Sequence, residues 1–99
     1  MALTFSMVTI KLVTVYRLSF TSKAKNQLEA LSGKLKKQVE KGLERIQKNP
    51  EFGKPLRGEL HGIWSERVAT FRILYKINRN EVEVLILVIE HRKNVYGGH

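Results

Sequence analysis

The sequence predicts a small α+β domain, in which two helices pack on one face of an antiparallel sheet of about four strands. Two observations support this fold class. Residues 71–89 (FRILYKINRNEVEVLILVI) indicate two strands joined by a tight turn. Residues 22–48 contain two stretches whose apolar residues recur with the period of a helix. The predicted order is strand, helix, helix, strand, strand, strand.

The first strand and the first helix follow from residues 15–33. From Val15 to Phe20, apolar and polar residues alternate, which is typical of a strand with one buried face. Thr21 or Ser22 is suited to cap a helix, because a side-chain hydroxyl can accept a hydrogen bond from a free backbone N–H group of the first turn. Gly33 is expected to end or bend this helix.

The second predicted helix spans about Lys34 to Lys48, and Asn49-Pro50 stops it. Its apolar stripe consists of Leu35, Val39, Leu43 and Ile46. The opposite side, which we call the basic ridge, consists of Lys37, Lys41, Arg45 and Lys48. Like charges four residues apart destabilise a helix by a few tenths of a kcal/mol per pair. The basic ridge is therefore either an exposed helix surface or a surface that faces phosphate groups.

The hairpin register predicts which side chains share a face of the sheet. A two-residue loop at Arg79-Asn80 would pair Tyr75 with Val84, and the apolar residues of both strands would then meet the helices. Residues 50–62, which contain two prolines and three glycines, are expected to be irregular. Residues 63–68 are expected to form the strand before the hairpin.

The same register places a set of polar residues on the face away from the core. Arg72 would lie opposite Leu87, and His91 would follow on the same face of the sheet. Arg92 and Tyr96 come directly after the predicted strand. We therefore expect one exposed patch with guanidinium, imidazole and phenol groups.

Length and charge limit the domain count and the class of partner. The 99 residues allow one domain, with residues 1–12 as an N-terminal extension and residues 13–99 as the domain itself. The formal net charge is +9, which favours a polyanionic partner, nucleic acid in particular. No apolar run reaches the roughly 18 residues of a membrane span, and no cleavage signal is recognisable, so the protein is expected to be cytoplasmic.

This chain lacks the residues that most common catalytic mechanisms require. There is no cysteine for a disulfide or a thiolate metal site, and no aspartate for a Ser-His-Asp triad. No glycine-rich phosphate loop is present. The histidines His61, His91 and His99 lack metal-ligand spacing. No metal or other cofactor is therefore expected.

The remaining chemistry is phosphodiester cleavage without a metal. Guanidinium groups can stabilise the charge that develops on the phosphate, and an imidazole can transfer a proton near neutral pH. If the attacking group is the 2′-hydroxyl of the substrate, RNA is the natural target. The candidate catalytic residues are Arg72, His91, Arg92 and Tyr96. The candidate RNA- or ribosome-binding residues are Lys37, Lys41, Arg45, Lys48, Lys54, Arg57, Arg67 and Lys93.

Each candidate also has a structural interpretation. His91 at a strand end is suited to a structural hydrogen bond, and Arg72 to a surface ion pair with Glu66 or Glu83. Tyr96 could simply pack against the domain. The sequence alone leaves these alternatives open.

Three segments resemble the RelE/ParE superfamily of bacterial and archaeal type II toxins: YRLSFTSKAKNQLEAL, GKPLRGELHGIWSERVATFRILYKI and VLILVIEHRKNVY. The resemblance covers about residues 15–96. It implies a ribosome-dependent endoribonuclease that cleaves mRNA in the decoding site by attack of the 2′-hydroxyl, and a cognate RelB-like antitoxin that neutralises it. By the same resemblance, Arg72 stabilises the transition state, and Arg92 and Tyr96 correspond to a basic residue and a tyrosine of the closing motif.

The sequence also departs from the family pattern. Lys54 stands where some relatives have a glutamate proposed as the general base, and Ile63 and Ser65 stand where others have lysines. The general base is therefore one of His91, Lys54 and Glu66. Two other functions stay open: a ParE-like inhibitor of DNA gyrase with the same fold, and an inactive RNA-binding relative.

Overall fold

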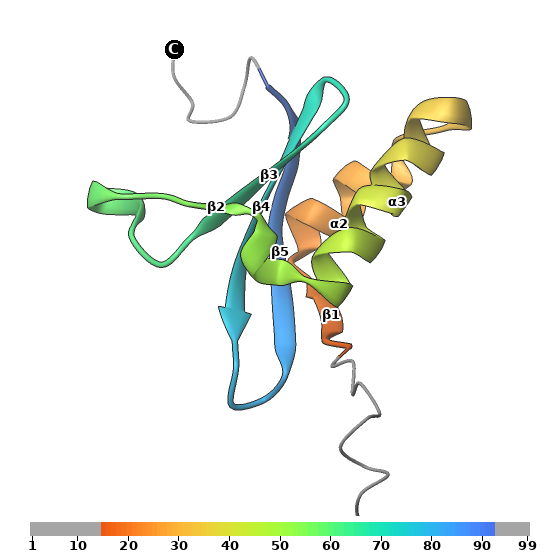
Figure 1. The fold of residues 1–99 in the computed structure, drawn as a ribbon. Coiled ribbons are helices and arrows are strands. Elements are labelled where there is room, and N and C mark those ends of the chain that lie inside the picture. Colours follow the sequence, from red (N-terminus) through yellow and green to blue (C-terminus); the bar gives the residue numbers. More distant parts are fainter. Residues whose placement is uncertain (1–14, 93–99) are drawn as a thin grey trace, which may run out of the picture.

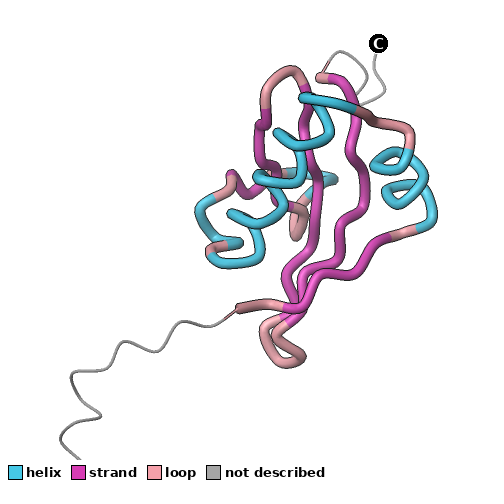
Figure 2. The backbone as a smooth tube through the Cα atoms, turned by 90° about the vertical axis from the view of Figure 1, so that its right-hand side faces the viewer, coloured by secondary structure: helices cyan, strands magenta, loops and turns pink. Residues whose placement is uncertain are grey.

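The computed structural model describes residues 15–92, in which a single sheet carries two helices on one face (Figure 1). Within this range the sheet has five strands, in the spatial order β1-β5-β4-β3-β2. The elements are β1 (Arg17–Phe20), α2 (Ser22–Glu29), α3 (Gly33–Lys48), β2 (Lys54–Pro55), β3 (Trp64–Val68), β4 (Phe71–Asn78) and β5 (Glu83–His91), with short 3-10 turns at Pro50–Phe52 and Gly58–Leu60. Figure 2, the view from the helix side, shows α2 and α3 spread over this face, with strands visible between them.

The predicted fold class is confirmed, and the sheet differs from the prediction in two details. It is mixed, because β1 pairs with β5 in parallel while the other neighbouring strands are antiparallel. A fifth strand, the two-residue β2, pairs with the start of β3 inside the segment that was expected to be irregular. Two residues are too few for a period-2 pattern, so the sequence could not indicate this strand.

Both helices begin where the sequence indicates. Thr21 is the N-cap of α2, and its hydroxyl accepts a hydrogen bond from the Ala24 N–H at 3.0 Å. Helix α3 presents its predicted apolar side to the sheet, with Val39, Leu43 and Ile46 buried. Leu35 on the same side is only half-buried.

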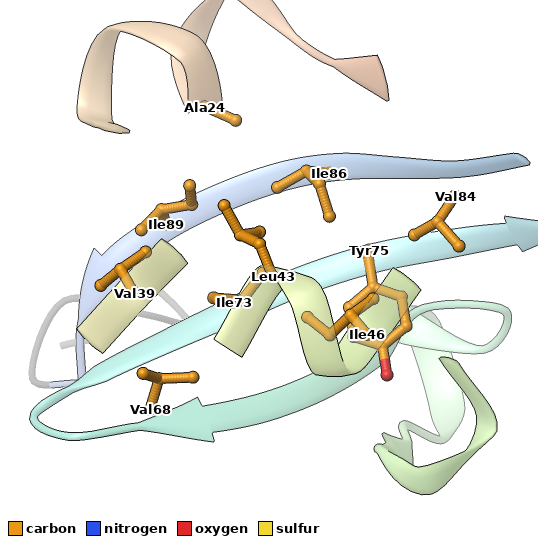
Figure 3. Close-up of a cluster of buried hydrophobic side chains, with 10 residues drawn as sticks. All are labelled: Ala24, Val39, Leu43, Ile46, Val68, Ile73, Tyr75, Val84, Ile86 and Ile89. Carbon is orange, nitrogen blue, oxygen red and sulfur yellow. The ribbon is translucent and has the colours of Figure 1, made fainter. Parts of the chain in front are cut away.

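The core lies between the helices and the sheet (Figure 3). Its members are Ala24, Val39, Leu43, Ile46, Val68, Ile73, Tyr75, Val84, Ile86 and Ile89. Helix α3 approaches β3 closely at Gly42, where a Cβ atom would lie 2.4 Å from a methyl group of Val68. Any side chain at position 42 would push the helix away from the sheet.

The predicted register of the β4–β5 hairpin is wrong. The connection takes four residues, not two, so Asn78 pairs with Glu83 and Tyr75 with Ile86. A shift of two residues keeps every side chain on its predicted face, since strand side chains alternate with a period of two. Val82 adopts a positive φ of 52° in this connection, and the Asn78 side chain accepts a hydrogen bond from the Glu81 N–H.

A β-bulge then changes the faces in the second half of β5. The register shifts by one residue between Tyr75 and Leu74, so that Leu74 pairs with Val88 and Leu87 has no partner in the ladder. Ile89, not Val88, is therefore the buried residue in this half of the strand. The predicted pairs beyond the bulge, including Arg72 with Leu87, are replaced.

Tyr75 fixes the loop after α3 to the sheet. Its ring is fully buried, and its hydroxyl donates a hydrogen bond to the Pro50 carbonyl at 2.6 Å. Gly53 lies against the same hydroxyl, and a Cβ atom at position 53 would be 2.1 Å from the Tyr75 oxygen and 3.0 Å from the Ser65 carbonyl. This close approach explains why a glycine is needed immediately before β2.

The substitution Gly53→Ala should destabilise the fold by about 1–3 kcal/mol, because its methyl group clashes with the Tyr75 hydroxyl. Chemical denaturation of the single and double variants measures the coupling. In a Tyr75→Phe background the cost of Gly53→Ala should be smaller, since the nearest clashing atom is gone. Strictly additive effects of the two substitutions would show that the hydroxyl does not cause the strain.

Burial raises the pKa of Tyr75 above its ordinary value of 10.0, and the nearby Glu66 carboxylate raises that pKa further. The unfolded chain therefore loses this proton at a lower pH than the folded chain does. The contribution of Tyr75 to stability is complete below about pH 10 and decreases at higher pH. We expect the Tm of the wild type to fall more steeply between pH 10 and 11 than that of Tyr75→Phe. Parallel Tm curves would contradict this.

Neither of the helices in the described range is both long and apolar enough to span a bilayer.

Candidate functional site

The candidate site lies on the face of the sheet away from α2 and α3, which we call the open face. No helix of the described chain covers it (Figure 1). Strand alternation places Arg72, Leu74 and Lys76 of β4 on the open face, because Ile73 and Tyr75 between them are buried under the helices. The expectation that Arg72 points away from the core is confirmed.

Arg72 is the centre of a cross-strand row of charges. In the ladder it lies opposite Arg67 on β3 and opposite Glu90 on β5. Arg72 is half-buried, and its Nε atom is shielded from solvent. Like charges directly opposite each other destabilise a sheet, so the pairing of Arg67 with Arg72 costs free energy. Two neighbouring guanidinium groups are also a favourable arrangement for an anionic ligand.

Lys54 shares the open face with Arg72. It pairs with Ser65, and Ser65 pairs in turn with Leu74, so the three residues form the cross-strand row next to that of Arg72. Lys54 is exposed on the edge strand β2. Because Lys54 belongs to β2, this predicted binding residue lies on the same face of the sheet as Arg72. Arg57 is also exposed, at the start of the second 3-10 turn.

The prediction that His91 shares a face with Arg72 is wrong. His91 pairs with Phe71, and its ring lies edge-on to the Phe71 ring with 5.8 Å between centroids. Because Phe71 alternates with Arg72, this pair belongs to the helix side of the sheet. The bulge is the cause, since it moves Glu90 into the position opposite Arg72.

The remaining predicted site residues, Arg92, Lys93 and Tyr96, follow β5 in the chain. The Arg92 N–H donates a hydrogen bond to the Thr70 carbonyl at 2.9 Å, which continues the pairing with β4 by one residue. Arg92 is exposed and directly follows His91, the last residue of β5. Lys93 and Tyr96 lie outside the described residues.

Two glutamates named in the sequence analysis have partners elsewhere. Glu66 pairs with Ile73 on the helix side, and its carboxylate accepts a hydrogen bond from Arg45 at 3.1 Å. The sheet therefore separates Glu66 from Arg72. Glu83 forms an ion pair with Arg17 at 3.6 Å. The carboxylate nearest to Arg72 in the ladder is Glu90.

The basic ridge is exposed along α3, on the opposite side of the sheet from Arg72. All four of its residues are exposed. Lys41 and Arg45 of the ridge, together with Arg67, line a shallow hollow of about 250 Å³. Arg67 therefore belongs to the row of Arg72 and also borders the ridge.

Comparison with known proteins identifies the family. A family model described as the ParE toxin of the type II toxin-antitoxin system parDE matches residues 18–96. The toxin RelG of Mycobacterium tuberculosis is 37% identical over 83 residues, which cover 82% of this chain and 95% of RelG. The chain belongs to the RelE/ParE superfamily of type II toxins.

Solved structures agree with this membership. The toxin-antitoxin complex RelBE2 of M. tuberculosis contains a chain that is 35% identical, with a TM-score of 0.72, over 79% of this toxin and 99% of that chain. The isolated E. coli RelE toxin is 24% identical, with a TM-score of 0.67, over 82% of this toxin and 90% of that chain. At 24% identity, the similarity to E. coli RelE is evidence for the fold alone.

Helix α2 supports the part of the toxin that carries the site. Strand β1 ends at Phe20, so the outer edge of β5 lacks a strand partner beyond Ile86. Two side chains replace it: the Thr21 hydroxyl donates to the Leu87 carbonyl at 2.8 Å, and the Gln27 carbonyl accepts from the Ile89 N–H at 2.7 Å. These bonds satisfy backbone groups that a sheet edge would otherwise leave exposed.

The same helix holds Glu90. The Gln27 amide donates to the Glu90 carboxylate at 3.2 Å, and the Lys23 ammonium lies 3.2 Å from the same oxygen atom. The Glu90 side chain is 21% exposed, so this pair is only partly screened by solvent. Sequence reasoning missed Glu90 and Gln27, because only the bulge brings Glu90 opposite Arg72 and only the tertiary fold brings α2 beside β5.

The substitution Gln27→Ala should destabilise the toxin by about 1–3 kcal/mol, because it leaves the Ile89 N–H without its side-chain partner. Hydrogen exchange followed by NMR should show faster exchange of the Ile89 amide. The exposed neighbour Asn26 offers a matched control, and Asn26→Ala should leave Ile89 exchange unchanged. If Ile89 exchanges equally slowly in Gln27→Ala, then α2 does not protect this edge.

Proposed function

We propose that this toxin is a ribosome-dependent endoribonuclease that cleaves mRNA in the decoding site and so inhibits translation. The observation that supports it most directly is the position of Arg72: half-buried on the face of the sheet away from α2 and α3, with Lys54 in the adjacent row and Arg67 on the next strand. A shielded guanidinium with further cations around it is suited to a phosphodiester group.

The reaction that fits this arrangement uses the RNA's own nucleophile. The 2′-oxygen attacks the adjacent phosphorus atom, the bond from phosphorus to the 5′-oxygen breaks, and a 2′,3′-cyclic phosphate and a 5′-hydroxyl result. The 2′-hydroxyl proton passes to a general base, and the departing 5′-oxygen takes up a proton. Arg72 stabilises the additional negative charge on the phosphate oxygens in the transition state.

Two of the three candidates for the general base remain. The Glu66 carboxylate is engaged by the Arg45 guanidinium, so we assign Glu66 no part in the chemistry. Lys54 lies on the open face, and His91 lies on the helix side of the sheet, at the strand end against Phe71. A His91→Gln variant and a Lys54→Ala variant distinguish the two, since only the loss of the general base removes the acidic limb of the pH–rate profile, where protonation of the base lowers the rate.

The proposed partners are mRNA and ribosomal RNA in the cytoplasm, and a RelB-like antitoxin. The RelBE2 structure of M. tuberculosis and the E. coli RelBE structure are complexes of a toxin with its antitoxin.

Substituting Arg72→Ala should lower the rate of mRNA cleavage on programmed ribosomes by about 10²–10³-fold, the usual effect of removing one donor that stabilises a transition-state charge. Combining it with Arg92→Ala should abolish growth arrest in cells. Lys25→Ala removes a positive charge from the exposed side of α2 and should leave the rate unchanged. Circular dichroism would verify that the variants are folded. Growth arrest that persists in the double variant would refute this assignment.

A second candidate function is inhibition of DNA gyrase. The match to the ParE family model and the exposed basic ridge on α3 favour it. A supercoiling assay with purified gyrase, run beside the ribosome assay, separates the two functions. If the toxin inhibits gyrase, the substitution of Lys37 and Lys41 by alanine should weaken inhibition while Arg72→Ala should not. If it cleaves mRNA, gyrase should stay fully active.

A further inference from the structure

The open face contains a second feature, a pocket of about 600 Å³ at the turn end of the β4–β5 hairpin. Its lining comes from three strands and the turn, and includes Ser19, Lys76, Asn78, Asn80, Glu83 and Leu85. We call it the hairpin-end pocket. Its volume is in the range of small-ligand sites in proteins.

The hairpin-end pocket lies on the same face as Arg72. Lys76 follows Arg72 by four residues on β4, so the two side chains point to the same side of the sheet. At the rise of a strand, this spacing separates them by about 13 Å. A single RNA strand that places one phosphodiester at Arg72 can therefore place a neighbouring nucleotide in the pocket.

The polar groups of the pocket are of the kinds that recognise base edges. Asn78 accepts the Glu81 N–H with its amide oxygen at 3.1 Å, which leaves its NH₂ group as a donor. The Glu83 side chain is 27% exposed, and its carboxylate has an ion pair with Arg17 at 3.6 Å, longer than a hydrogen bond. Carboxylates accept hydrogen bonds from the exocyclic amino groups of bases, and amides bind base edges in pairs.

Lys76 supplies the ammonium group of the pocket. Arg79 also borders it, but the Arg79 guanidinium donates two hydrogen bonds to Glu51, and this contact raises the pKa of Arg79. Lys76 is exposed, and its neighbour across the ladder is the apolar Leu85. The pocket therefore offers an ammonium group for a phosphate beside an apolar surface for the flat face of a base.

We propose that the hairpin-end pocket binds the base of a nucleotide next to the cleaved bond and selects bases that carry an exocyclic amino group. In this arrangement, Leu85 contacts the face of the base, Glu83 accepts from its amino group, and Lys76 neutralises the adjacent phosphate. The pocket would make this end of the hairpin the specificity determinant of the toxin. The inference rests on the proposed RNA substrate and names residues that the cleavage chemistry does not use.

Sequencing of the cleaved mRNA ends tests the selection. Wild-type toxin on ribosomes programmed with a randomised codon library should favour an amino-bearing base over uracil at one fixed distance from the cut. Glu83→Gln keeps the size of the side chain but replaces one acceptor oxygen by a donor. This variant should reduce the preference about tenfold, the discrimination that one good base contact gives.

Glu66→Gln is the matched control for this experiment. Glu66 is also a half-buried strand glutamate paired with an exposed arginine, but it lies on the helix side of the sheet. It should leave the sequence preference unchanged. An identical preference for wild type and Glu83→Gln would overturn the proposal, and so would an equal change in both variants.

Crosslinking locates the base without depending on cleavage. Arg72→Ala toxin, bound to ribosomes whose mRNA carries 6-thioguanosine in the decoding-site codon, next to the bond to be cleaved, is irradiated and analysed by mass spectrometry. The crosslink should map to residues 76–85, and Lys76→Ala should weaken it. If the crosslinks map elsewhere while the wild type still cleaves mRNA, the proposed base binding in the pocket is refuted and the proposed nuclease activity is not. Crosslinks at 76–85 with no cleavage by the wild type would support the pocket and refute the nuclease.

Discussion

The pairing of β4 with β5 is the constraint on which the rest of this toxin depends. These two strands form the middle of the sheet, and their inner faces supply five of the core residues. The single bulge in the pairing bends the strand and exchanges its two faces over the last four residues. Without it, His91 would lie on the open face and Glu90 would lie under the helices, where an unpaired carboxylate would be costly.

The bulge also explains the role of α2. Beyond the end of β1, the outer edge of β5 has no strand beside it, and the backbone groups there need partners. Thr21 and Gln27 supply them, and Gln27 binds Glu90 in the same contact. One short helix therefore terminates the sheet and holds the carboxylate that lies opposite Arg72. The hydrogen bonds of Thr21 and Gln27 therefore stabilise this edge of the sheet, and the bond from Gln27 also positions Glu90 in the candidate site.

The two faces of the sheet have different chemistry for a simple reason. The helix side is filled by aliphatic side chains and Tyr75, and its exposed charges lie mainly on the outer surfaces of α2 and α3. The open face keeps Arg72, Lys54 and Lys76 around the apolar residues Leu74 and Leu85. An apolar surface with cations along it is the usual platform for single-stranded nucleic acid. The proposed cleavage and the proposed base selection both use this one face.

The sequence by itself determined the fold class, both helices and the identity of most core residues, because local periodicity and capping residues specify these features. It also determined that Arg72 points away from the core, since a register error of two residues leaves the faces unchanged. Only the tertiary structure decided the neighbours of Arg72. The bulge, the two-residue strand β2 and the contact of Gln27 with β5 join residues that are distant in the chain, and no short-range pattern encodes such contacts.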